Sequence, residues 1–391
     1  MKVGIVLSVA PSYSETFFIS KIKGLMNSGF EVILFVQKNK SKFSICQVVE
    51  APQVSINNFL WQSVKVCYTL TSFLICFPKR FLKFVKLERK INRPWIQIVK
   101  NLYNNIHLLK SHLDWVHFGF ATIAIQSEHV PKTIGAKMAV SFRGYDLVLS
   151  PREDEDYYLN VWKNVDQVHS ISNYLLKLAY DLKLPLKTPY KIIRPAIDHF
   201  RFKNEDVKSF ETIQFLTIGR LHWIKGLKDT LEALHIIRNK GIKFSYTIIG
   251  DGPERNELIA LIKQLELTRY VKLVGRKTHT EVINYFNNST YYLQYSESEG
   301  FCNAVLEAQS MGLLCIVSDG GALPENVLNE NTGWVVPSKQ PYTLAKTISK
   351  VLNLSNKTKE VISLNAQVRV RDEFNLLVQQ EQFKDFYHQN V

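Results

Sequence analysis

Cysteine is scarce in this sequence and follows no recognisable pattern. The five cysteines (Cys46, Cys67, Cys76, Cys302 and Cys315) contain no Cys-x-x-Cys pair and no regular spacing. The sequence therefore predicts neither a disulfide framework nor a zinc site.

Long apolar runs are missing as well. Residues 1–8 are too short to be the hydrophobic region of a signal peptide and predict a first strand instead. The most apolar internal run, residues 66–77, is far shorter than a membrane span. Internal repeats and low-complexity tracts are also lacking, so we expect a cytoplasmic protein.

The length and the hydrophobic pattern predict an α/β protein with two domains. A chain of 391 residues with 46% hydrophobic and 21% charged content is globular and too long for one ordinary core. Short apolar strands alternate with amphipathic helices in both halves, which favours two parallel, doubly wound sheets. The expected domains are residues 1–200 and 201–370, followed by a helix at 371–391 that crosses back to the first domain.

Acidic residues are nearly missing between residues 61 and 100, where nine basic residues accompany the single acid Glu88. Within this stretch Phe77, Phe81, Phe84 and Val85 fall on one face of an expected helix, flanked by lysines. Two interpretations stay open: peripheral contact with an anionic membrane surface, or a helix packed on its own domain with a solvated basic face. Because no recognition module for nucleic acid is present, we expect no nucleic-acid partner.

The most informative segment runs from Glu299 to Glu307. An expected strand at 290–295 is followed by a polar turn and a helix that Asn303 is placed to cap. Unpaired backbone N–H groups and the dipole at such a helix N-terminus favour an anion. Glu299 would stand in the loop beside that anion, and Glu307 about one turn into the helix.

A second glycine-flanked loop carries two cations. Gly219-Arg220 and Lys225-Gly226 follow the first expected strand of the second half. An arginine fork and a lysine point charge at the carboxyl end of a strand suit a diphosphate.

These segments resemble the Glu-x7-Glu signature and the Gly-Arg-Leu…Lys-Gly element of the retaining glycosyltransferases of family 4. The resemblance implies the GT-B fold, in which two Rossmann-like domains face each other across a cleft. It also implies a nucleotide-sugar donor, with Glu299, Arg220 and Lys225 as catalytic residues and Glu307 on the ribose. The donor-binding set it implies is Gly219, Arg220, Lys225, Gly275, Lys277, Glu299, Gly300, Phe301, Cys302, Asn303 and Glu307.

The first half matches the family less completely. Ser14-Glu15-Thr16 is similar to a variant found in polysaccharide-assembly members, although Ser14 and Glu15 also suit a simple helix start. Arg143 stands where the family usually has a histidine, which puts proton transfer at this position in doubt because arginine stays charged. Asp146 is expected either to order its loop or to touch the acceptor.

A metal site is not expected. The acidic run at residues 154–156 follows Ser150-Pro151, a typical cap and first position of a helix, and not an apolar strand. The resemblance thus implies a metal-independent retaining glycosyltransferase without cofactor. Its acceptor would be a lipid-linked saccharide or an oligosaccharide, in lipopolysaccharide, capsule or exopolysaccharide assembly. The enzyme would work at the cytoplasmic face of the inner membrane. The alternatives are a sugar-nucleotide epimerase of the same fold and a non-catalytic nucleotide- or nucleic-acid-binding protein.

Overall fold

The computed structural model describes residues 1–11, 16–39, 43–54, 59–151, 154–203 and 208–388. The chain divides into two compact units, one formed by Met1–Ile193 with Gln379–Val391 and the other by Arg194–Val378. The change of unit between Ile193 and Arg194 lies close to the domain boundary expected at residue 200.

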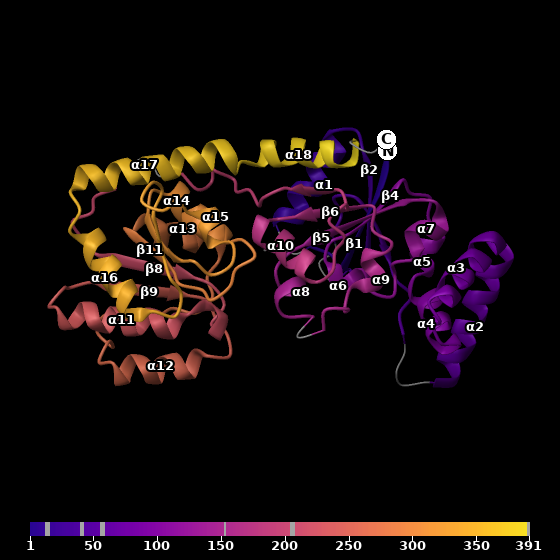
Figure 1. The fold of residues 1–391 in the computed structure, drawn as a ribbon, viewed down its shortest axis with the longest axis horizontal. Coiled ribbons are helices and arrows are strands. Elements are labelled where there is room, and N and C mark those ends of the chain that lie inside the picture. The colour runs from indigo at the N-terminus through magenta and orange to yellow at the C-terminus, as the bar shows by residue number, and fades with distance from the viewer. Residues whose placement is uncertain (12–15, 40–42, 55–58, 152–153, 204–207, 389–391) are drawn as a thin grey trace. The chain divides into compact units, whose positions relative to one another are not determined.

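The first unit is built on a seven-stranded sheet in which all paired strands are parallel (Figure 1). Its strands, in spatial order, are β3 (Gln47–Glu50), β2 (Glu31–Lys38), β1 (Lys2–Val9), β4 (Trp115–Phe118), β5 (Lys137–Phe142), β6 (Gln167–Ser170) and β7 (Tyr190–Ile192). The central strands are nearly continuous apolar runs, because helices cover both faces of a parallel sheet. Val3, Ile5 and Leu34 in β1 and β2 are fully buried as a result.

Helices connect these strands. They are α1 (Thr16–Asn27), α2 (Phe59–Cys76), α3 (Pro78–Lys90), α4 (Trp95–Asn104), α5 (Ile106–Leu109), α6 (Ala121–Ala124), α7 (Val130–Ile134), α8 (Tyr145–Val148), α9 (Leu159–Trp162) and α10 (Asn173–Asp181). The final helix, α18 (Leu376–His388), adds Phe383, Phe386 and Tyr387 to the core of the first unit.

Helices α2, α3 and α4 form an insert between β3 and β4, and its packing decides between the two interpretations of the aromatic face. Phe84 is completely buried, and the rings of Phe77 and Phe81 pack at a tilt against the buried Phe73 of α2. The aromatic face of α3 therefore belongs to the core of the insert. The lysines Lys79, Lys83, Lys86 and Lys90 remain exposed.

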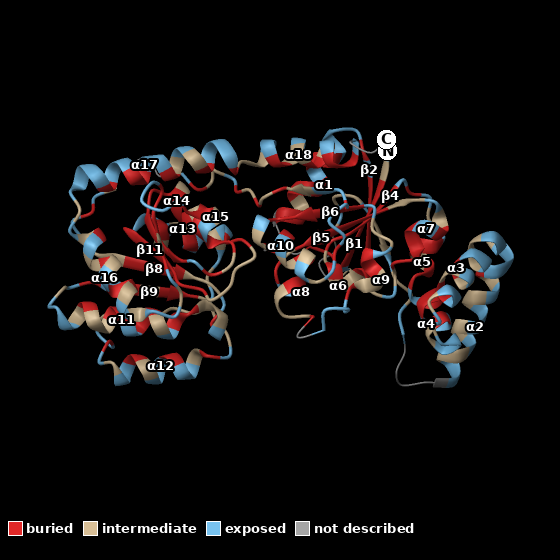
Figure 2. Ribbon diagram, in the orientation of Figure 1, coloured by how far each residue is buried: buried red, intermediate tan, exposed pale blue. Residues whose placement is uncertain are grey.

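The second unit is built on a six-stranded parallel sheet. Its strands, in spatial order, are β10 (Val271–Leu273), β9 (Ser245–Ile249), β8 (Gln214–Ile218), β11 (Tyr291–Gln294), β12 (Leu314–Ser318) and β13 (Trp334–Val336). The helical elements are η1 (Trp223–Lys225), α11 (Leu227–Asn239), α12 (Arg255–Gln264), α13 (His279–Asn287), α14 (Asn303–Ser310), α15 (Leu323–Asn326), α16 (Pro341–Leu352) and α17 (Asn356–Glu373). Its strands form the buried centre of the unit, and the outward faces of α11, α12, α16 and α17 are exposed (Figure 2).

The α/β architecture with two parallel sheets confirms the predicted fold class. Two local expectations need correction. The short edge strand β3 was not predicted, because four residues that are only partly buried give too weak a pattern. Cys302, not Asn303, is the N-cap of α14, and Asn303 is its first residue.

Candidate functional site: a cationic pocket in the second unit

A pocket of about 380 Å³ opens beside the carboxyl ends of β8 and β9 in the second unit. Parallel sheets bind ligands beyond the carboxyl ends of their strands, because the loops there carry polar groups. The residues that line this pocket are Ile218, Gly219, Arg220, Ile249, Gly250, Asp251, Arg276, Lys277, His279, Val282 and Glu307.

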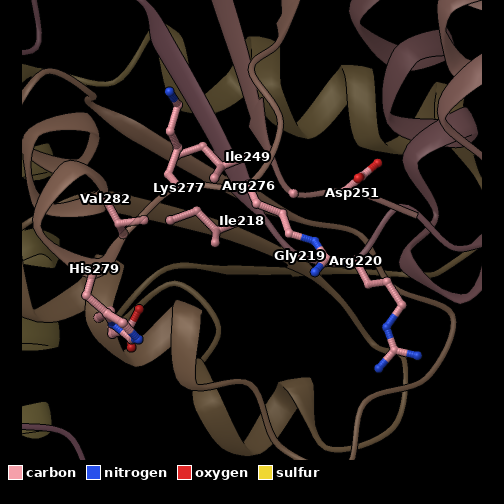
Figure 3. A pocket seen from close by; sticks show the side chains of 11 residues that line it. Ile218, Gly219, Arg220, Ile249, Asp251, Arg276, Lys277, His279 and Val282 are labelled. Carbon is pink, nitrogen blue, oxygen red and sulfur yellow. The ribbon is translucent and has the colours of Figure 1, made fainter. Parts of the chain in front are cut away.

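Two guanidinium groups give the pocket its positive charge. Figure 3 shows Arg220 and Arg276 extending to the same side, whereas Lys277 extends away from them. Lys277 is engaged elsewhere, since its Nζ lies 3.2 Å from Glu281 Oε1. Within the described parts of the chain, neither Arg220 nor Arg276 has a hydrogen-bond or ion-pair partner. Two unengaged arginines at one edge of a pocket suit a diphosphate.

Glu307 contributes the carboxyl group that lines the pocket. None of the residues that the structure describes donates a hydrogen bond to it. Burial raises the pKa of Glu307 to about 8, although Arg201 acts in the opposite direction. A carboxyl group that lacks donors and is kept neutral by burial is suited to a ligand that brings hydroxyl groups to it.

A partly buried ion pair lies next to the pocket. Lys225 Nζ is 2.5 Å from Glu299 Oε1, which also accepts hydrogen bonds from Ser296 Oγ at 2.8 Å and from Gln294 Nε2 at 3.2 Å. Burial by itself would lower the pKa of Lys225, but the Glu299 carboxylate more than offsets this, so the pKa is raised and the amine stays charged. A Cβ added at Gly219 would lie 3.7 Å from Lys225 Cε, which places the lysine stem beside the pocket wall.

Two glycines hold the loops of this ion pair in place. Gly226, directly after Lys225, has φ +59°, and a Cβ there would lie 2.0 Å from the carbonyl oxygen of Tyr295. Gly321 has φ +67° and packs against the backbone of Glu299, while Ala322 N donates to Glu299 O at 2.8 Å. Only glycine permits both the left-handed conformation and the close approach.

The N-terminus of α14 is fixed by a buried amide. Asn326 accepts a hydrogen bond from Cys302 N and donates one to Cys302 O, both at 3.1 Å. In the described part of the chain, no acceptor pairs with the backbone N–H groups of Asn303 and Ala304. These groups carry the positive end of the helix dipole, which favours an anion, and Glu307 lies one turn further along the helix.

The structure thus places the predicted donor residues in different surroundings. Gly219, Arg220, Lys277 and Glu307 line the pocket, and Lys225 with Glu299 lies beside it. Phe301 packs against Phe374, and Cys302 is buried, where burial raises the pKa of its thiol to about 12.

Gly275 and Gly300 do not line the pocket. Gly275 O accepts a hydrogen bond from Gly250 N, which ties the loop before Arg276 to the turn after β9.

Sequence reasoning did not select Arg276, His279 or Asp251 as site residues. Arg276 stands beside the predicted Lys277, and only the direction of its side chain distinguishes it. His279 begins α13, and burial together with Arg201 lowers its pKa, so the ring is neutral near pH 7. Asp251 accepts a hydrogen bond from the neighbouring Gly252 N at 2.9 Å. Each of the three residues lies close to the end of a strand, and this position could have identified it as a candidate site residue.

In the first unit, Asp146 is fully buried and orders its loop. Its carboxylate accepts hydrogen bonds from Arg143 N at 2.9 Å and Ala121 N at 3.2 Å. Burial raises the pKa of Asp146, and these hydrogen bonds counteract the rise. The Arg143 guanidinium lies over the ring of Phe17, 3.5 Å from its centroid.

The remaining expected acceptor contacts lie at the start of α1. Ser14 and Glu15 fall outside the described residues, and of Thr16 only the backbone is described, as the first residue of α1. Within the described ranges, no group of three or more His, Cys, Asp or Glu side chains is arranged to hold a metal ion.

Comparison with known proteins gives a consistent result. Residues 199–369 match the family model described as glycosyl transferases group 1. The WcaL protein of Escherichia coli (strain K12), whose name assigns it to colanic acid biosynthesis as a glycosyltransferase, is 25% identical over 394 residues, which cover 96% of each chain.

Solved structures extend the likeness to the whole fold. A glycosyltransferase from Rickettsia africae ESF-5 is similar with a TM-score of 0.73 and 20% identity, covering 100% of this chain and 99% of that one. Anabaena HepE, solved in complex with UDP, is similar with a TM-score of 0.72 and 14% identity over 98% of each chain. Together with the two parallel sheets, these matches show that the chain has the GT-B fold.

Proposed function

We propose that the protein is a retaining glycosyltransferase that moves a sugar from a nucleotide-sugar donor to a lipid-linked saccharide acceptor. The observation that carries this proposal is the pocket that Arg220, Arg276 and Glu307 line together, with the Lys225–Glu299 pair beside it. The chemistry of these groups matches the parts of a nucleotide sugar: cations for the diphosphate and a carboxyl group for the ribose.

The second unit would bind the donor. Arg220, Arg276 and the N-terminus of α14 would hold the diphosphate, and Glu307 would accept hydrogen bonds from the ribose hydroxyls. Gly275 and Lys277 would lie toward the base. The structure of HepE with UDP supports a nucleotide of this kind as ligand.

Catalysis would rest on charge stabilisation. During transfer the bond between the anomeric carbon and the diphosphate oxygen breaks, and a bond to the acceptor oxygen forms on the same face. The acceptor hydroxyl passes its proton to the departing diphosphate oxygen. Arg220 and Lys225 would neutralise the charge that builds on the departing nucleoside diphosphate, and such stabilisation is commonly the largest catalytic contribution. Glu299, held by Lys225, Ser296 and Gln294, would orient the donor sugar and stabilise its oxocarbenium-like transition state. No metal would be required.

The first unit would bind the acceptor, with Arg143 and the start of α1 as its polar contacts. The WcaL relative supports a place in the assembly of a cell-surface polysaccharide such as lipopolysaccharide, capsule or exopolysaccharide. A lipid-linked acceptor of that kind lies at the cytoplasmic face of the inner membrane, where the enzyme would work as a peripheral protein.

Thermal stabilisation by UDP-, GDP-, ADP- and CDP-sugars, measured in EDTA, tests the donor site. We expect one nucleotide class to raise the unfolding temperature and Glu307→Ala to reduce that rise. A rise that depends on added Mg²⁺ would contradict metal independence, and no rise with any class would contradict the donor site.

The anomeric configuration of the product, read by NMR from the coupling constant of the anomeric proton, tests retention. Inverted product would contradict the proposed stereochemistry. Conversion of the donor sugar without any acceptor would instead identify an epimerase.

A further inference from the structure

Helix α2 carries a stripe of exposed apolar side chains along its length. Leu60, Val64, Tyr68 and Ile75 are between 59% and 77% exposed. At 3.6 residues per turn these four positions fall within an arc of roughly 80°. Lys65 is the only charged residue in the helix, so the stripe is uninterrupted by charge.

The neighbouring helices also carry exposed apolar side chains. On α4, Trp95, Ile96 and Val99 are exposed, and on α3 Leu82 is 63% exposed. Helices α2, α3 and α4 contact one another and lie together in the insert (Figure 1). Exposed apolar side chains gathered on packed helices in this way indicate an interaction site.

The insert does not need this surface for its own stability. Its core is formed by Phe73, Phe84, Ile98 and Leu102, which are buried. The helices therefore have two apolar faces, one used internally and one presented outward.

The charges around the stripe indicate what covers it. Six exposed basic side chains lie on α3 and α4, the helices that contact α2, namely Lys79, Lys83, Lys86, Arg89, Lys90 and Lys100. The one acid of the region, Glu88, is buried and bound by Arg93 at 2.9 Å and His129 at 2.6 Å, so it does not offset the surface charge. Arg80 is also engaged internally, donating to the carbonyl oxygens of Leu109 and Ser111.

We propose that helix α2, together with the exposed side chains of α4, lies in the interface of an anionic phospholipid bilayer. Apolar and aromatic side chains flanked by lysines suit this interface, because the rings enter the acyl boundary while the amines meet the headgroups. A second copy of the chain would bring the same positive charge and is disfavoured by repulsion. The occupied face is α2, whereas the aromatic face of α3 that the sequence suggested is internal.

The helices would lie on the bilayer and not cross it. Among the described helices, none alone is both long and apolar enough to cross a bilayer, and α2 and α3 reach that length only as a pair bent by 114°. A helix lying in the interface keeps its lysines in water, in keeping with the exposed amines of α3.

This inference deepens the proposed function, because a surface-bound enzyme would meet an acceptor carried by a membrane lipid. Vesicle binding is measured without donor or acceptor, so it can fail while the donor site stands. The experiment uses the full chain with vesicles of phosphatidylcholine alone and with phosphatidylglycerol added, followed by flotation. We expect binding only to the anionic vesicles.

Two variants test the two halves of the surface. Tyr68→Ser with Ile75→Ser removes apolar area without changing charge, and Lys83→Glu with Lys86→Glu reverses two charges. Each is expected to weaken partitioning at least tenfold. The matched controls, Leu186→Ser and the pair Lys346→Glu with Lys357→Glu, alter exposed residues elsewhere and should bind as the unmodified protein does.

Unchanged partitioning of the Tyr68/Ile75 variant would overturn the role of α2, even if charge reversal weakened binding. Absence of binding to anionic vesicles would overturn the proposal as a whole. Concentration-dependent dimerisation that the same two substitutions abolish would assign the surface to a second copy instead. Donor-induced thermal stabilisation of each variant should be unchanged, which shows that the variant is folded.

Discussion

Glu307 should make donor binding release a proton. Its pKa of about 8 in the free protein means that at pH 7 about nine-tenths of the molecules hold the proton. Ribose hydroxyl groups would donate to the carboxylate and stabilise its charged form, which returns the pKa toward its ordinary value of 4.5. Binding of a nucleotide sugar at pH 7 should therefore release about 0.9 proton per site.

Isothermal titration calorimetry in buffers of different ionisation enthalpy measures this number. The binding enthalpy should vary linearly with the buffer's ionisation enthalpy, and the slope gives the protons exchanged. A nucleotide sugar is the right ligand, because its diphosphate diester does not titrate near pH 7. Glu307→Gln should abolish this release. Any exchange that remains in the variant should be proton uptake by His279, because a bound anion raises the pKa of a neutral imidazole.

Glu307 should also make the stability of the free protein depend on pH. Its folded pKa lies above the ordinary value of 4.5, so the unfolded chain loses this proton first as pH rises. The contribution of Glu307 to stability is therefore fully present below pH 4.5 and is lost as pH rises toward 8. At pH 7 the loss amounts to about 3 kcal/mol, from 1.36 kcal/mol per pKa unit.

Chemical denaturation of the unmodified protein and of Glu307→Gln between pH 5 and 8 would measure the difference between their free energies of unfolding. We expect the unmodified protein to lose stability relative to Glu307→Gln across this range.

In the calorimetric experiment, proton uptake on donor binding, or an equal proton release by Glu307→Gln, would refute the assignment of Glu307 to the ribose.

Three further predictions concern the loops around the pocket. Lys225→Met should lower the free energy of unfolding by about 3 kcal/mol in urea denaturation, because it leaves the largely inaccessible Glu299 carboxylate without its cation. Adding Glu299→Gln should restore most of that stability but not transfer activity, and a double variant as unstable as the single one would contradict this. Gly226→Ala should lower the unfolding temperature clearly more than Gly241→Ala. Both glycines have positive φ, so both substitutions strain the backbone. Only at Gly226 would the added Cβ meet a backbone carbonyl oxygen, at 2.0 Å, whereas nothing lies within 4 Å of a Cβ at Gly241. Arg276→Ala should weaken donor binding at least tenfold in calorimetry with an unchanged unfolding temperature, and unaltered affinity would remove Arg276 from the site.

Hydrophobic periodicity along the chain was sufficient to predict the two parallel sheets. In a parallel sheet covered on both faces, strands such as Glu31–Lys38 and Leu314–Ser318 contain short apolar runs, and the helices between strands are amphipathic. This pattern is local, so a single sequence carries it. The four-residue edge strand Gln47–Glu50 escaped prediction because its side chains are only partly buried.

Local sequence also indicated several groups of the candidate site. Gly219, Arg220 and Glu307 stand directly after strands or at a helix start, and these positions converge at one edge of a parallel sheet. The sequence could not show that Lys225 is bound by Glu299, since the two are 74 residues apart along the chain.

The direction in which a side chain points was decided by tertiary packing alone. Arg276 and Lys277 are adjacent, equally basic residues, yet one extends toward Arg220 and the other pairs with Glu281 (Figure 3). Tertiary packing likewise decides which of the two apolar faces of the insert is buried and which is exposed. Composition showed that aromatic and basic residues alternate there, but only the packing of Phe84 into the interior left α2 as the outward face. Burial depends on contacts between segments distant in sequence, and periodicity within one helix does not contain them.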